Sequence, residues 1–78
     1  MASRYDWFME TWIRSDGRYQ TFWLDEDLFG LVVIVLYGGD HHCRHRLIPV
    51  ESEEAGACVM ERLGKRRRAH GYTLEGMG

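Results

Sequence analysis

The sequence predicts an α+β domain, in which an antiparallel sheet of four or five strands has one C-terminal helix packed on it. Two strand-forming segments, residues 19–24 and 31–36, lie close together, and one helix-forming segment, residues 52–69, follows them. A chain of 78 residues makes one domain, residues 1–78. A domain of this size buries a little more than ~60% of its unfolded surface, so its core is small but adequate.

The apolar segment 31–36 predicts the central strand. It has no polar break, and its β-branched residues at 32–35 favour a strand over a buried helix. A membrane-spanning helix needs about 20 apolar residues, so we expect no contact with a membrane. Residues 19–24 are aromatic and β-branched, which suits the neighbouring strand. We expect the turn between these strands at residues 25–30, which contain Asp25-Glu26-Asp27 and Gly30.

Residues 4–14 predict the first strand, joined to the second by a turn at Ser15-Asp16-Gly17. The odd-numbered residues of this segment are the more apolar, and we expect them to face the core. Phe8 and Trp12 lie on the other face. They either pack under a second layer or form a contact surface, and packing is favoured because large aromatic residues are mostly buried.

Residues 44–50 predict the fourth strand, in which Pro49 belongs at an edge or a strand end because it cannot donate a hydrogen bond. Ser52 is a suitable N-cap for the helix that follows, and Gly71 is placed to end it. Residues 71–74 can add a last short strand. The helix face expected to meet the sheet contains Ala55, Cys58, Val59 and Leu63. The residues expected to pack between helix and sheet are Val33, Val35, Tyr19 and Leu63.

Charge and cysteine usage exclude some classes of protein. Ten Lys and Arg residues against twelve Asp and Glu give a net charge of −2, which does not by itself demand a nucleic-acid partner. Residues 2–6 lead into no apolar segment, so we expect no signal peptide. We expect Cys43 and Cys58 to be free thiols in the cytoplasm.

The run Asp40-His41-His42-Cys43-Arg44-His45 contains residue types that bind zinc. A structural zinc site draws its ligands from two separated pairs, and no second pair exists here. Adjacent ligands in one loop also converge poorly, so we interpret the run as a polar loop and expect no metal or cofactor. No nucleophile motif or glycine-rich phosphate loop is present, so we expect no catalysis.

Residues 12–74 contain, in this order, Gly17-Arg18-Tyr19, Asp27-Leu28-Phe29-Gly30, Ser52-Glu53-Glu54-Ala55 and Gly71-Tyr72. In order and spacing these segments resemble the WGR domain, a small module named for a Trp-Gly-Arg triplet. Tyr37-Gly38-Gly39 stands at the place of the triplet, without its Trp and Arg.

The resemblance implies DNA binding. WGR domains occur in DNA-repair poly(ADP-ribose) polymerases, where the module binds DNA near a break. They also occur in bacterial proteins of the molybdate-metabolism-regulator type and as short free-standing chains. In this sequence Tyr37 is placed to stack on a base or sugar. Arg44 and Arg46 follow closely and are candidates to replace the missing Arg. Arg66 and Arg67, in the basic run 65–68, form either a phosphate-binding patch or a solvated helix end.

The sequence therefore predicts a small, non-catalytic bacterial binding module whose partner is DNA or another nucleic acid. The alternative is a protein-interaction module, such as a small regulator or inhibitor from a mobile element. The acidic balance, the acidic turn Asp25-Glu26-Asp27 and the aromatic residues Phe8 and Trp12 favour that alternative.

Overall fold

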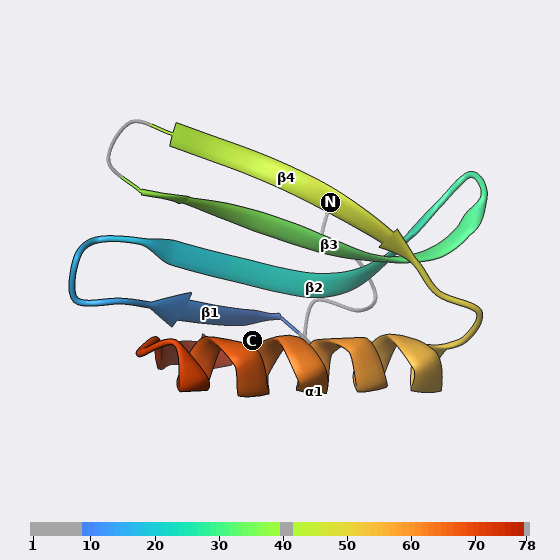
Figure 1. Cartoon of the computed structure of the whole chain (residues 1–78). Coiled ribbons are helices and arrows are strands. Elements are labelled where there is room, and N and C mark those ends of the chain that lie inside the picture. Colours follow the sequence, from blue (N-terminus) through green and yellow to red (C-terminus); the bar gives the residue numbers. More distant parts are fainter. Residues whose placement is uncertain (1–8, 40–41, 78) are drawn as a thin grey trace.

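The computed structural model describes residues 9–39 and 42–77, and it confirms the predicted α+β fold. A five-stranded antiparallel sheet in the order β4-β3-β2-β1-β5 has one helix, α1, on one face (Figure 1). The elements are β1 (Glu10–Ile13), β2 (Tyr19–Asp27), β3 (Gly30–Gly39), β4 (His42–Pro49), α1 (Glu53–Ala69) and β5 (Thr73–Met77). The first four strands form a meander, and β4 is an edge strand that ends at Pro49, as predicted.

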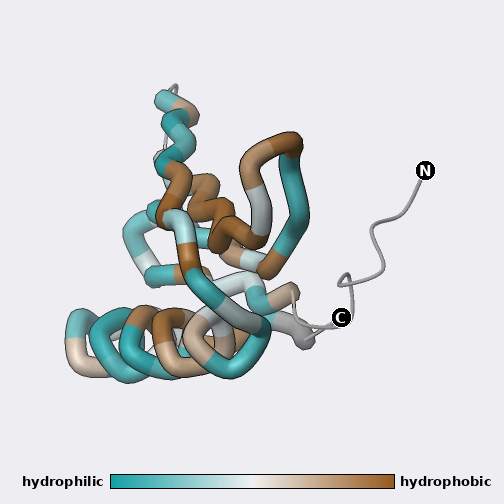
Figure 2. The backbone as a smooth tube through the Cα atoms, turned by 90° about the vertical axis from the view of Figure 1, so that its right-hand side faces the viewer, coloured by the Kyte–Doolittle hydropathy of each residue, from teal (hydrophilic) through white to brown (hydrophobic). Residues whose placement is uncertain are grey.

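The β2–β3 hairpin is longer than predicted. Asp25 pairs with Val32 and Asp27 with Gly30, so the acidic residues belong to strand β2 and not to the turn. Leu28 and Phe29 alone connect the strands. Charged side chains are tolerated at the exposed end of a strand, so strand pairing continues through them until the glycine turns the chain. Figure 2 shows the hairpin standing clear of the helix, with a hydrophobic end.

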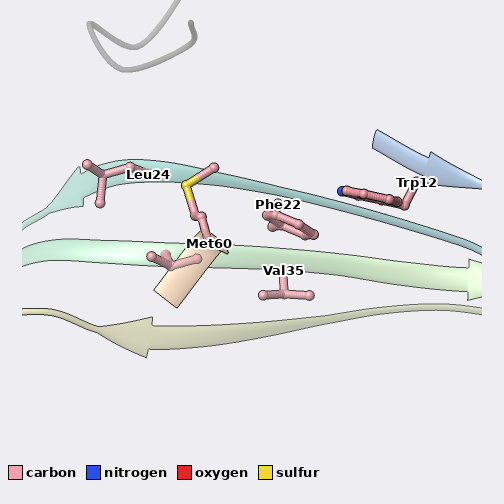
Figure 3. Packing of buried hydrophobic residues seen from close by; sticks show 6 residues of the cluster. Trp12, Phe22, Leu24, Val35 and Met60 are labelled. Atoms are coloured by element: carbon pink, nitrogen blue, oxygen red, sulfur yellow. The ribbon is translucent and has the colours of Figure 1, made fainter. Parts of the chain in front are cut away.

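The core lies between α1 and the central strands. Phe22 and Leu24 of β2 pair with Val35 and Val33 of β3, and all four face the helix. Phe22 and Val33 have no exposed surface. Trp12 from β1 and Met60 from α1 complete the cluster (Figure 3), and Leu63 packs at its margin. Val33 and Val35 are thus core residues, as the sequence predicted.

The face predicted for the first strand is wrong. Trp12 is 3% exposed and lies against the helix, whereas Thr11 and Ile13 lie on the opposite face. Ile13 is 38% exposed. Tyr19, paired with Ile13, also lies on the opposite face and not in the core. The alternation of residue types in this segment shows which residues share a face. It does not show which face is buried, because the partner strand and the helix decide that.

The helix meets the sheet through a stripe that matches the predicted one only in part, because Val59 and Leu63 pack against the core as predicted. Its buried residues are Gly56, Met60 and Gly64, and Cys58 is exposed. A Cβ atom on Gly56 would lie 2.7 Å from Leu24 Cδ1, and one on Gly64 would lie 3.2 Å from Trp12 Cζ2. The glycines weaken the helix by about 1 kcal/mol each relative to Ala. In return they allow the helix backbone to approach Leu24 and Trp12 of the sheet closely.

Both ends of α1 are capped as the sequence predicts. The Ser52 hydroxyl accepts a hydrogen bond from the Ala55 backbone N–H at 3.1 Å. At the other end, Gly71 adopts a positive φ of 86°, which favours glycine. The Tyr72 N–H then donates to the Arg67 carbonyl at 2.9 Å, and the Gly71 N–H donates to the Arg68 carbonyl at 3.2 Å. This Schellman arrangement reverses the chain into β5.

Replacing the buried Phe22 by Ala should lower the free energy of unfolding by about 3–5 kcal/mol, because it removes a ring from the centre of the core. Urea denaturation followed by tryptophan fluorescence measures the loss. The matched control is Phe29→Ala in the same hairpin, where 96% of the side chain is exposed and the change should stay within about 0.5 kcal/mol. Equal losses for the two variants would contradict the assigned core.

Cys43 and Cys58 should both react with iodoacetamide in the native protein, because both are free and exposed. Intact mass spectrometry should show the same two adducts with and without denaturant. A mass two hydrogens low that resists alkylation would instead indicate a disulfide.

Candidate functional site

A cleft of about 580 Å³ lies at the end of the sheet opposite the β2–β3 turn. The β1–β2 turn, the end of β3 and the C-terminal end of α1 meet there, on the left of Figure 1. We name this the basic cleft; its lining includes Arg18, Gln20, Tyr37, Arg44, Arg67 and Tyr72, together with Asp16 and His42. Aromatic rings and guanidinium groups thus share one concave surface.

Strand register brings three of these residues into one row. Gln20 of β2 lies opposite Tyr37 of β3, and Tyr37 lies opposite Arg44 of β4. Paired residues of an antiparallel sheet point to the same face, here the face that carries α1. The Gln20 Oε1 atom is buried and has no hydrogen-bond partner. A polar group in that position costs about 1–3 kcal/mol, which a bound hydrogen-bond donor would offset.

The helix C-terminus supplies the other side of the basic cleft. Because the chain reverses at Gly71, Tyr72 returns beside Arg67, and the Arg67 guanidinium carbon lies 5.0 Å from the Tyr72 ring centroid. Arg14 approaches the same ring at 5.9 Å. These cation–π contacts orient the guanidinium groups. The Arg67 Nε atom is buried without a partner, so a donor on the cleft wall is unsatisfied.

Arg18 was not among the candidates from the sequence, yet it lies beside the triplet position. A Cβ atom on Gly39 would lie 3.1 Å from Arg18 Cγ and 3.3 Å from Arg18 Cα. The Arg18 side chain therefore occupies the space beside Gly39, so a cation is present even though residue 39 has none. Its Nε atom lies 3.6 Å from Asp16 Oδ2, and 65% of the side chain is exposed. Strand pairing across the β2–β3 hairpin was the signal that could have identified it.

Gly38 allows a close contact on the opposite face of the sheet. It lies between Tyr19 of β2 and Cys43 of β4, and a Cβ atom there would overlap the His42 carbonyl and lie 3.1 Å from the Tyr19 hydroxyl. A hydrogen bond with the Cys43 side chain raises the pKa of the Tyr19 hydroxyl above its ordinary value, and desolvation adds to that shift.

The structure brings together three of the five residues predicted to bind nucleic acid. Tyr37, Arg44 and Arg67 line the basic cleft. Arg46 is exposed on the same face of β4 but lies opposite Val35, outside the cleft lining. Arg66 is exposed on α1, and it also lies outside the lining.

The structure places one of the two residues of the alternative protein-contact hypothesis. Trp12 is buried in the core, so it presents no contact surface, and the packing interpretation is confirmed for it. Phe8 lies outside the described residues, as does His41 of the histidine-rich run. His42 and Cys43 are adjacent in β4 and point to opposite faces. Over residues 9–39 and 42–77, no three His, Cys, Asp or Glu side chains are placed to hold one metal ion.

Comparisons with protein-family models, curated proteins and solved structures found no match to this chain. In the part of the chain that the structure describes, no helix has the length and hydrophobicity needed to span a membrane. The arginine and tyrosine side chains of the basic cleft are therefore the features that point to a function.

Replacing Gly38 by Ala should destabilise the domain by about 1–3 kcal/mol, because the added Cβ meets the backbone of β4. Gly39→Ala is the milder comparison, since the nearest atom there belongs to the exposed Arg18 side chain. Thermal and urea denaturation of both variants should give the larger loss for Gly38. A larger loss at Gly39 would contradict this account of the triplet position.

Proposed function

We propose that this domain is a non-catalytic module that binds nucleic acid, with DNA as its ligand, through the basic cleft. The observation that supports this most directly is the convergence of Arg18, Arg44 and Arg67 on a cleft that also contains the rings of Tyr37 and Tyr72. Guanidinium groups bind phosphates, and an aromatic ring stacks on bases of any sequence. The combination is typical of surfaces that bind single strands or frayed ends.

The distribution of charge supports the proposal more than the net charge does. The basic cleft, Arg14 and the basic end of α1 (Arg66, Arg67 and Arg68) share one end of the molecule. Asp16 offsets part of this charge through its 3.3 Å ion pair with Arg14 and its contact with Arg18. Three arginines and one aspartate line the cleft, and such an excess of cations attracts an oppositely charged ligand even when the net charge of the protein is −2.

Unsatisfied polar atoms on the cleft wall also support a ligand with both donors and acceptors. The Gln20 carbonyl oxygen and the Arg67 Nε–H are buried without partners. A nucleotide offers amino groups to the first and phosphate oxygens to the second, once a shift of the two side chains exposes these atoms to the cleft. In this arrangement Tyr37 stacks on an unpaired base while Arg18 and Arg44 contact the flanking phosphates. Because this stacking contact requires an unpaired base, we propose that the domain binds strand ends more tightly than closed duplex DNA.

The resemblance to WGR domains favours the same function. Tyr37 keeps an aromatic ring at the first position of the triplet, and Arg18 supplies a cation beside the third. A reducing compartment such as the cytoplasm fits this function and the two free thiols.

Fluorescence anisotropy with labelled single-stranded, nicked and blunt duplex DNA tests the proposal. Three contacting guanidinium groups should give a log–log salt slope of about −2.1 for single strands and about −2.7 for duplex. Arg18→Gln and Arg44→Gln should each reduce the magnitude of that slope by about 0.7–0.9. The matched control is Arg62→Gln, an exposed position outside the cleft lining, and it should leave the slope unchanged.

The stacking role has its own pair of variants. Tyr37→Leu should weaken binding to strand ends by about 1–3 kcal/mol, because the ring is lost while an apolar side chain remains. Tyr37→Phe retains the ring and should bind within about twofold of the original protein. Absence of binding to all three DNA forms at low salt, or equal loss in the Arg62→Gln control, would contradict the proposal.

A further inference from the structure

The tip of the β2–β3 hairpin presents two large apolar side chains to solvent. Leu28 is 97% exposed and Phe29 is 96% exposed. The turn is held in shape, because Asp27 Oδ1 accepts a hydrogen bond from the Phe29 N–H at 2.7 Å and Gly30 adopts a φ of 127°. A fully exposed apolar pair on a turn whose backbone is already fixed is typical of a contact anchor, since its burial costs little backbone ordering entropy.

Acidic residues surround this tip. Glu26 and Asp27 are exposed directly below it on β2, and Glu53 and Glu54 begin α1 at the same end of the molecule (Figure 1). The carboxylates disfavour an anionic lipid surface as the partner. They favour a partner in which an apolar or aromatic recess has a basic rim.

The basic cleft has that chemistry. The rings of Tyr37 and Tyr72 provide the recess, and Arg18 and Arg44 provide the basic part of the rim, where Asp16 offsets part of the Arg18 charge. Tip and cleft lie at opposite ends of the β2–β3 hairpin. Nine residues of strand separate them by about 30 Å at the usual rise per residue, so the tip cannot reach the cleft of its own molecule.

We propose that the hairpin tip of one molecule docks into the basic cleft of a second copy, so that the protein associates head to tail. Phe29 enters beside the Tyr37 and Tyr72 rings, while Glu26 and Asp27 meet Arg18 and Arg44. Such a contact is heterologous, so each molecule keeps one free tip and one free cleft, and association continues into chains or rings. The interface is small, which makes the association weak, reversible and dependent on concentration.

Sedimentation velocity from micromolar to millimolar protein at low salt tests this. The average mass should rise with concentration and fall when salt is added. The double variant Leu28→Ser with Phe29→Ser, and separately Arg44→Glu, should each raise the apparent Kd at least about tenfold. Two control variants should associate like the original protein. Leu47→Ser alters another apolar side chain, 52% exposed, and Arg62→Glu reverses a charge outside the cleft.

Mixing the two defective variants distinguishes head-to-tail docking from other modes. The tip variant keeps an intact cleft and the Arg44→Glu variant keeps an intact tip, so the mixture should form a heterodimer and stop there. All variants should melt within a few degrees of the original protein, because every substituted side chain is exposed. A protein that stays monomeric at millimolar concentration, a cleft variant that still self-associates, or a mixture that stays monomeric would overturn the proposal.

Discussion

The close contact of α1 with the sheet through Gly56 and Gly64 is the constraint on which the rest of the structure depends. With no side chain at these two positions, the helix backbone approaches Leu24 and Trp12 directly, and Met60 between them enters the core. The same contact fixes the direction of the helix. Its C-terminal end then falls beside the β1–β2 turn, which places Arg67 in the basic cleft.

Turn chemistry then decides which side chains each end of the molecule exposes. At one end, the Schellman arrangement at Gly71 and the register of three strands gather arginines around tyrosine rings. At the other, a two-residue turn leaves Leu28 and Phe29 exposed above carboxylates. The two ends therefore differ in charge and in shape. Because nucleic acid and a second copy are proposed to use the same cleft, the two forms of binding are mutually exclusive.

Two adjacent glycines at the triplet position have separate physical roles. Gly38 gives the Tyr19 hydroxyl room to reach Cys43, on the face away from the helix. Gly39 leaves space for Arg18 on the cleft side. Residue 39 carries no charge itself, but the space that this glycine leaves is occupied by the Arg18 side chain from the neighbouring strand.

The sequence by itself determined what depends on local rules. Strand β3 follows from its β-branched run, the ends of α1 from Ser52 and Gly71, and the edge position of Pro49 from its missing donor. Only the tertiary structure decided which face of β1 is buried and which arginines meet in one cleft. Both depend on register and on helix direction, which are set by contacts between residues far apart in the chain that local periodicity does not encode.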